Sequence, residues 1–357
     1  MRRDQVAAPG ACGGVDEFGR RSRGVREQSF CRRRQRAIRK APWPLMGILP
    51  GLFNHDVRNR RARRFKTTLS EADFLFRRAA EGVADRLADV KRVFPRAAIV
   101  GAAGGAIAEA IAGRPEAAET IQTESAADLA NVVSRPGVST RITEEEAPAL
   151  PSDLDLVVGG LTLHRVNDPV GLLTQMRLAL KPDGLALIAT FGGRTLAELR
   201  ASFAEAEAEV EGGVSPRVAP MGEIRDLGAL LQRAGFALPV ADVDRFEVLY
   251  ATPFHLMRDL RAMGETNILT ARRMSFTRRT TMMRMAEIYA ASFPAPEGRV
   301  KATFEIVYLT GWSPDASQPR ALRPGSAKTR LADALGSDEI SLGDRASPFD
   351  PGRGRAK

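Results

Sequence analysis

The sequence predicts an α/β protein built around a parallel, doubly wound sheet. Short apolar segments alternate with segments in which apolar residues recur at helical spacing, the pattern of strands joined by helical crossovers. Two strand segments, residues 154–163 and 185–191, are nearly continuous apolar runs, as expected for strands buried on both faces. Helical crossovers between strands are right-handed and place the strands parallel. A chain of 357 residues can bury such a core without cross-links.

Composition separates a basic extension from a nearly neutral remainder. Residues 1–45 contain 12 Lys and Arg against 4 Asp and Glu, whereas the remainder contains 41 against 39. The extension shows little hydrophobic periodicity, which predicts disorder. Organellar targeting sequences avoid acidic residues, whereas this extension contains four. We therefore favour an extended start site, with Met46 as the natural first residue of the protein, over a targeting sequence. The neutral remainder gives no reason to expect nucleic-acid binding.

Further segments follow the extension, and composition limits their chemistry. We expect an N-terminal helical segment over residues 46–95, a main domain over 96–336 and a disordered polar tail over 337–357. Cys12 and Cys31 both lie in the extension, so the main domain has no disulfide, cysteine zinc site or thiol nucleophile. Three histidines are a poor basis for a multi-histidine centre, and we predict no metal. No apolar run reaches the roughly 18 to 20 residues of a membrane-spanning helix.

The elements can be followed in order along the chain. Residues 57–66 predict a basic helix, which we interpret as a solvated face in preference to a docking surface for an acidic partner or a cofactor phosphate. Asp168 before Pro169 is typical of a helix N-cap, and residues 181–184 (KPDG) predict a turn. The expected strands are residues 96–101, 118–125, 137–143, 154–163, 185–191, 244–251 and 301–312. The expected helices after the first strands are residues 168–180, 195–211 and 226–234, with further helical material in an insertion over 252–300 that caps a ligand site or forms a partner surface.

A glycine-rich loop follows the first strand of this pattern. In "AAIVGAAGGAIAEAI" (residues 97–111) an apolar run leads through glycines into a helical pattern. In a parallel sheet this loop lies at the carboxyl end of a strand, where glycines let backbone N–H groups approach a ligand. Taken alone, the loop is equally typical of a tight strand–helix turn. We expect the cofactor-binding positions of the loop to be Gly101, Ala103, Gly104 and Gly105.

Other candidate site residues follow the second, third and fourth strands. Glu124 lies 23 residues after Gly101, close to the spacing of an acid that binds a ribose hydroxyl. Glu144 and Glu145 follow the third strand and are candidates for the adenine amino group, although a run of glutamates is more often a solvated loop. Leu161 completes the expected cofactor-binding set.

His164 follows the fourth strand, at the rim of the expected site. Its ordinary pKa near neutral pH would let it act as a general base and take a proton from an attacking nucleophile. A structural role, holding the following loop in place through a hydrogen bond, is the interpretation that we favour.

Several stretches identify a family by resemblance. Residues 150–193, with "LTLHRVNDP" and "LKPDG", resemble class I S-adenosylmethionine-dependent methyltransferases, and more narrowly the methyltransferase type 11 or malonyl-carrier-protein methyltransferase-like group. Residues 191–236, "LMRDLRAMGETN" and "YLTGW" resemble mitochondrial complex I assembly factor 5 and its bacterial relatives. The resemblance covers residues 52–334. It implies a Rossmann-like, seven-stranded sheet with helices on both faces, the last strand antiparallel and a helical insertion between the last two strands.

The resemblance also implies a cofactor, S-adenosylmethionine, bound at the glycine-rich loop with an acid after the second strand. Ile99 stands where the family usually has aspartate, and Ala103 where it has the middle glycine. Matching the family pattern puts Thr123 at the acidic position, with Glu124 one residue along. We therefore predict that the loop binds the cofactor with weakened affinity.

Three functions follow from these observations. The first is methyl transfer from S-adenosylmethionine to a carboxylate, a small molecule or a protein side chain. The second, implied by the assembly-factor resemblance, is hydroxylation of an arginine on a respiratory complex I subunit. The third is a scaffold with a degraded cofactor pocket, whose contact residues would be Arg258, Arg261, Arg272 and Arg273. The resemblance further implies a cytoplasmic bacterial protein, or a mitochondrial matrix protein if the source is eukaryotic.

Overall fold

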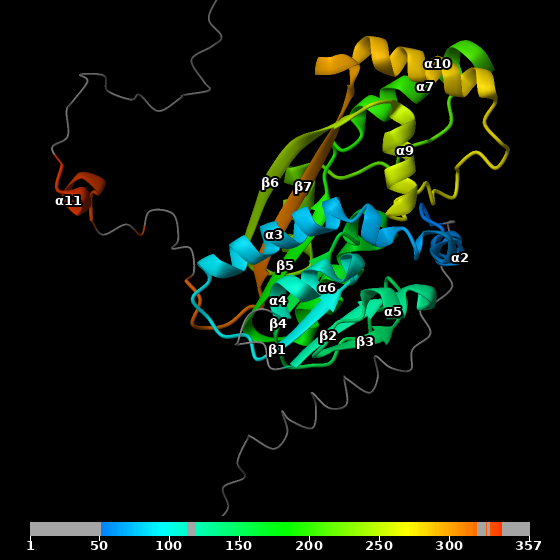
Figure 1. The fold of residues 1–357 in the computed structure, drawn as a ribbon. Helices are drawn as coiled ribbons and strands as arrows, with labels where there is room; N and C mark the ends of the chain where they lie inside the picture. The colour runs from blue at the N-terminus through cyan, green and yellow to red at the C-terminus, as the bar shows by residue number, and fades with distance from the viewer. Residues whose placement is uncertain (1–50, 113–118, 320–325, 327–328, 338–357) are drawn as a thin grey trace, which may run out of the picture. The chain divides into compact units, whose positions relative to one another are not determined.

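The computed structural model describes residues 51–112, 119–319, 326 and 329–337 (Figure 1). The extension over 1–45 and all but the first residue of the tail over 337–357 lie outside the described residues, so the disorder predicted there stays a prediction.

Seven strands form one mixed sheet in the order β3-β2-β1-β4-β5-β7-β6. Strand β7 runs antiparallel to both of its neighbours, and the pairs on the other side of β5 are parallel. This topology confirms the fold class, including the antiparallel last strand. The strands are β1 (Arg96–Val100), β2 (Glu119–Glu124), β3 (Val138–Ile142), β4 (Leu154–Gly160), β5 (Leu180–Phe191), β6 (Ala237–Tyr250) and β7 (Val300–Trp312).

Strand β4 ends at Gly160, three residues before its predicted end, and two other strands begin well before their predicted starts. The KPDG segment is part of β5 instead of a separate turn, because Leu154 pairs with Leu180 and Leu156 with Leu185, so that extra residues of β5 bulge out of the ladder. Strand β6 begins at Ala237, seven residues before its predicted start, since its pairing with β7 reaches Trp312. The start of β6 contains Pro239 and Asp242, residue types that are rare within strands, so the sequence pattern hides this extension. The strand accommodates them because β6 lies at the edge of the sheet.

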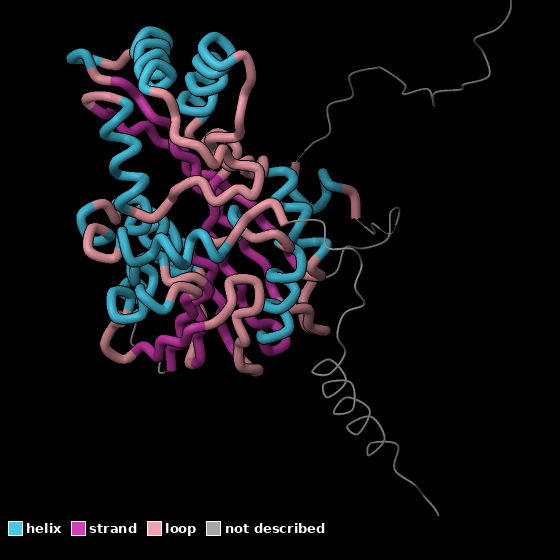
Figure 2. Tube along the Cα trace, turned by 90° about the vertical axis from the view of Figure 1, so that its right-hand side faces the viewer, coloured by secondary structure: helices cyan, strands magenta, loops and turns pink. Residues whose placement is uncertain are grey.

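Alternate residues of the central strands face two separate core layers. Ala97 and Ile99 belong to the layer that includes α3, and Ala98 and Val100 to the layer that includes α6 and α8. Figure 2 shows strands flanked by helices on both sides, as predicted. The longer helices are α2 (His55–Phe65), α3 (Phe74–Asp89), α6 (Pro169–Ala179), α7 (Ala197–Glu211), α8 (Ile224–Arg233), α9 (Pro253–Ala262) and α10 (Arg279–Ser292). The shorter helices are α4 (Ala106–Ala112), α5 (Ala130–Val133) and α11 (Leu331–Leu335).

Capping groups fix the ends of two helices that border the site. The Gly171 amide donates to Asp168 Oδ1 at 2.7 Å, which confirms Asp168 as the N-cap of α6. The Val57 amide likewise donates to Asn54 Oδ1 at 3.1 Å at the start of α2. Each cap sets the residue at which its helix begins.

The N-terminal helical segment and the insertion after β6 contact each other. The Asn54 amide donates to the Ile268 carbonyl at 2.9 Å, and Phe53 forms a β-bridge with Leu269. In Figure 1 the start of α2 lies beside the chain that leaves α9. Segments more than 200 residues apart in sequence therefore border the same edge of the sheet.

Candidate functional site

The glycine-rich loop turns sharply at the carboxyl end of β1. Four of its five residues have positive φ: Gly101 (79°), Ala103 (44°), Gly104 (64°) and Gly105 (85°). A Cβ at Gly101 would lie 1.9 Å from Thr162 Oγ1, so this position requires glycine. Ala103 adopts a left-handed conformation that costs an L-residue roughly 1–2 kcal/mol. Ala103 and Gly104 line a cavity at this edge, and Ile99 lies below it, fully buried in the core.

Glu124 is the last residue of β2, and its carboxylate is buried beside the loop. Its Oε1 accepts hydrogen bonds from Arg58 Nη1 at 3.1 Å and from the amides of Ser125 and Ala126 at 2.9 and 3.0 Å. Glu124 Oε2 accepts none from the residues that the structure describes. Thr123, by contrast, uses its hydroxyl within the sheet, at 3.4 Å from both the Ile99 carbonyl and the Gly101 amide. The acid at this strand end is therefore Glu124.

The two glutamates after β3 have different surroundings. Glu145 is buried, and its Oε1 accepts from Arg165 Nε at 2.6 Å while Oε2 lies 3.2 Å from His55 Nδ1. Burial alone raises the pKa of Glu145, but the Arg165 and Arg58 guanidiniums and the His55 hydrogen bond outweigh it and hold the pKa well below its usual range. Glu144 is exposed and lines none of the cavities at this edge. The structure thus brings Glu145, and not Glu144, to the site.

Arg165 links the two halves of a buried charge network. Besides Glu145, its guanidinium donates through Nη1 to Glu265 at 2.8 Å. Burial by itself lowers the pKa of Arg165, but the two carboxylates raise it, so the side chain stays charged. The network joins α2, the segments at the ends of β2, β3 and β4 and the residues after α9: His55, Arg58, Glu124, Glu145, His164, Arg165 and Glu265.

His164 lies at the wall of this network. Its Nε2 is 3.4 Å from Glu265 Oε2, and its ring packs edge-on against Phe191 with centroids 4.8 Å apart. Its Nδ1 is buried and has no hydrogen-bond partner among the described residues. A histidine whose Nε2–H donates to a carboxylate has a basic Nδ1, so this geometry accommodates either a structural or a proton-accepting role.

The space at the strand ends is divided into a polar and an apolar compartment. The polar compartment consists of two narrow cavities, of about 370 and 220 Å³ when space open to solvent is included, that share Arg58, Glu124 and Arg165 as walls. Leu161 lines the larger of the two. The apolar compartment is a cavity of about 720 Å³, space open to solvent included, whose apolar lining is Phe53, Phe191, Leu196, Leu199, Val218, Ala219, Met221, Leu260, Ile268 and Phe304.

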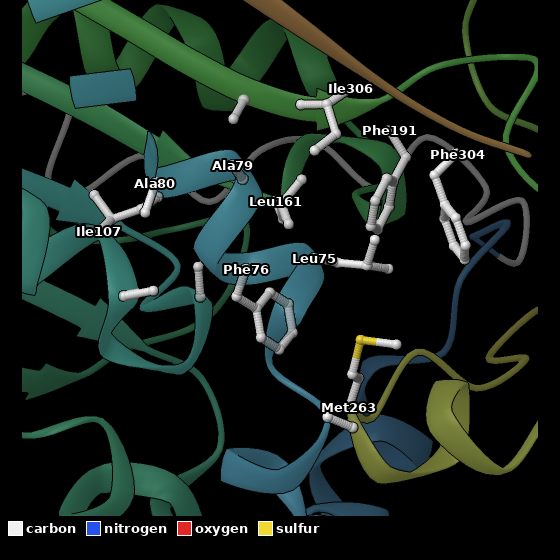
Figure 3. Close-up of a cluster of buried hydrophobic side chains, with 14 of the residues drawn as sticks. Leu75, Phe76, Ala79, Ala80, Ile107, Leu161, Phe191, Met263, Phe304 and Ile306 are labelled. Atoms are coloured by element: carbon white, nitrogen blue, oxygen red, sulfur yellow. The ribbon is translucent and has the colours of Figure 1, made fainter. Parts of the chain in front are cut away.

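The two compartments meet at shared side chains. Glu265, Arg58 and Arg165 line both of them. Figure 3 shows Leu161, Phe191 and Phe304 in the buried cluster packed around α3, near Met263. A ligand in one compartment would therefore lie directly beside a ligand in the other.

Comparison with known proteins gives the family. A family described as "Methyltransferase domain" matches residues 73–239. "Arginine-hydroxylase NDUFAF5, mitochondrial" of Danio rerio is 38% identical over 266 residues, 74% of this chain and 83% of that protein. The Homo sapiens protein of the same name is 38% identical over 287 residues, 77% and 81% of the two chains. "Malonyl-[acyl-carrier protein] O-methyltransferase" of Halorhodospira halophila is 31% identical over 265 residues, 72% and 88%. The chain belongs to the class I S-adenosylmethionine-dependent methyltransferase family.

Membership in this methyltransferase family confirms the predicted enzyme class and the cofactor expected of it. The residues at the strand ends fit S-adenosylmethionine. Glu124 Oε2 is available to accept hydrogen bonds from ribose hydroxyls, and the turn at Gly101 keeps the backbone close to the same space.

Two further findings concern only the described part of the chain. None of its helices is long and apolar enough to span a membrane, and none of its His, Cys, Asp and Glu side chains form a group of three or more suited to a metal ion.

Sequence analysis missed four members of the charge network in this methyltransferase: His55, Arg58, Arg165 and Glu265. Arg58 was included in a solvated basic face, which is wrong for this residue: its side chain is buried against Glu124. The available signal was its spacing, because Arg58 lies four residues before buried Ala62 on one face of α2. Arg165 and Glu265 lie within stretches that carry the family resemblance, but no local pattern pairs residues 100 positions apart.

Proposed function

We propose that this chain is a methyltransferase that binds S-adenosylmethionine over the carboxyl ends of β1, β2 and β4. The observation that carries the proposal is Glu124, a buried carboxylate beside the glycine turn with one oxygen left to accept hydrogen bonds. In this arrangement Glu124 binds the ribose hydroxyls, and Gly101, Ala103, Gly104, Gly105 and Leu161 shape the contact surface. Glu145, held ionised by Arg165, bounds the adenine side, and Glu144 stays outside the site.

The acceptor side chain or molecule occupies the apolar compartment. When bound, S-adenosylmethionine supplies a methyl group already activated by its sulfonium, so the protein contributes mainly positioning and exclusion of water. Phe191, Leu196 and Phe304 keep water from the reacting atoms. His164, with Nε2 toward Glu265, receives the acceptor's proton at Nδ1.

Titration calorimetry with S-adenosylmethionine tests the cofactor site. Glu124→Gln keeps the size of the side chain and its bonds to backbone amides but removes the charge, and we expect roughly a tenfold to hundredfold rise in Kd. Glu144→Gln, on an exposed neighbour, is the matched control and leaves Kd unchanged. Equal Kd values for the wild type and Glu124→Gln would overturn the assignment. No binding by the wild type at millimolar concentration would instead leave the scaffold function.

Arginine hydroxylation is the second candidate, because the relatives in Danio rerio and Homo sapiens are named arginine-hydroxylases. Glu265 supports it, since this carboxylate borders the apolar compartment and already binds a guanidinium, that of Arg165. The acceptor would then be an arginine of a respiratory complex I subunit, and the reaction would use dioxygen and a two-electron donor as co-reactants: one oxygen atom enters the C–H bond and the other leaves as water. Mass spectrometry of a candidate acceptor separates the two reactions: methylation adds one CH₂ and hydroxylation adds one oxygen. For location, we infer the cytoplasm of a bacterium or, in a eukaryote, the mitochondrial matrix.

A further inference from the structure

Four arginines from two distant segments line an open cavity outside the proposed active site. Arg61 and Arg64 of α2 and Arg258 and Arg261 of α9 surround a space of about 980 Å³ that includes open solvent. We call these four residues the arginine surface. In Figure 1 the helices that carry them, α2 and α9, lie on the same side of the molecule.

The positive charge of the arginine surface is almost uncompensated. Within the described part of the chain, Arg64 and Arg261 form no ion pair, and Arg258 reaches only its own neighbour, Asp259, at 3.9 Å. Burial lowers the pKa of Arg61, and repulsion from Arg272, Arg64 and Arg60 lowers it further. Like charges gathered in this way favour binding of an anion.

The arginine side chains favour carboxylates as the bound groups. Guanidinium groups match the planar geometry of carboxylates and can bind them through two parallel hydrogen bonds. The insertion that carries Arg258 and Arg261 also exposes two large apolar side chains outside the lining of this cavity: Met274 is 80% exposed and Phe276 fully exposed. Large exposed apolar side chains are typical of surfaces that a protein partner covers.

The arginine surface shares a wall with the apolar compartment. Thr266 lines both cavities. Arg61 Nη1 donates to Thr266 Oγ1 at 3.1 Å and to the Asn267 carbonyl at 2.8 Å, which fixes α2 to this wall. An extended chain lying on the arginine surface is therefore separated from the apolar compartment by the wall that contains Thr266.

We propose that the arginine surface docks an acidic, Asp- and Glu-rich segment of a protein acceptor and so delivers a neighbouring side chain to the apolar compartment. The delivery step rests on the proposed function, whereas the docking step does not. The acceptor is accordingly a protein, and recognition is separated from the reacting side chain.

Fluorescence anisotropy of a labelled decaglutamate peptide with the full chain tests the docking. The triple variant Arg64→Gln, Arg258→Gln, Arg261→Gln removes three exposed charges, and we expect it to weaken peptide binding about tenfold or more. The matched control is Arg141→Gln, Arg225→Gln, Arg233→Gln, which removes the same charge from exposed positions on β3 and α8. We expect it to change binding less than about twofold. Equal losses in the two triple variants, or no loss in either, would overturn the proposal.

Two competitors test the chemistry of the partner. At constant ionic strength, inorganic phosphate should leave the peptide bound, and displacement would assign a phosphate site instead. Vesicles containing phosphatidylserine should bind the wild type and the arginine triple variant equally. Loss of vesicle binding in the triple variant, with weak peptide binding throughout, would assign the surface to a membrane and contradict the proposal. Because calorimetry reads cofactor binding separately, a failure of docking and a failure of the proposed function are distinguishable.

Discussion

The two compartments at the strand ends have walls of different chemistry. The polar compartment is walled by charged side chains whose partners come from α2, β2, the loop after β4 and the residues after α9. The apolar compartment is walled largely by side chains that need no specific partner. A buried charge is tolerated only when it is paired, whereas an apolar wall tolerates any well-packed shape. The polar compartment is therefore tied to the stability of the fold, whereas the apolar compartment depends less on any single contact.

The largest effect should come from breaking the charge network. Arg165→Met leaves Glu145 and Glu265 buried without their shared partner, and we expect the free energy of unfolding to fall by roughly 3–5 kcal/mol, measured by urea denaturation. Arg284→Met breaks an exposed ion pair with Glu209 and should change stability little. Similar small losses in both variants would remove the contrast between the compartments.

Filling the apolar compartment should affect one compartment alone. Val218→Phe adds a ring to a partly buried wall of the apolar compartment. We expect it to weaken binding of the uncharged dye N-phenyl-1-naphthylamine about tenfold, because the ring fills space that the dye would occupy. The Kd for S-adenosylmethionine should stay within about twofold of the wild type, because Val218 lines neither polar cavity. Coupled losses in both titrations would show that the compartments are not independent.

Relieving strain in the loop should stabilise the polar side. Ala103→Gly removes the cost of a left-handed alanine, and we expect the free energy of unfolding to rise by up to about 1 kcal/mol. Ala102→Gly is the control, because φ at Ala102 is −68° and glycine there relieves nothing. Urea denaturation should show the gain for Ala103→Gly only.

The smallest effect concerns pH. Hydrogen bonding to Glu145 raises the pKa of His55 above 6.5 despite burial, so His55 stabilises the fold fully below 6.5 and loses this contribution as pH rises through the raised value. His55→Asn should reduce the fall in melting temperature between about pH 6 and about pH 8. Glu146, whose Oε1 lies 2.9 Å from His55 Nε2, and Glu145 give a pH dependence of the opposite sign. Their pKa values are lowered, so their contribution to stability is lost only as the solution becomes acidic. An unchanged pH profile in His55→Asn would assign the dependence to other groups.

Local pattern predicted the sheet and the loop because burial leaves its period in the sequence. Strand β4, buried along almost its whole length, appears as an apolar run, and the N-cap Asp168 acts on an amide three residues away. Local pattern was less able to decide which of two adjacent residues reaches the site. Thr123 and Glu124, or Glu144 and Glu145, differ by one position, and the direction of each side chain depends on how the strand ends meet across the sheet.

The sequence by itself determined the alternation of strands and helices, the glycine turn after β1 and the family. Tertiary structure decided which acids reach the site and which arginines hold them. Arg58 binds a carboxylate 66 residues away, and Arg165 binds one 100 residues away. Hydrophobic periodicity is a local property, whereas an ion pair between distant segments forms only once packing brings them together and excludes water from around them.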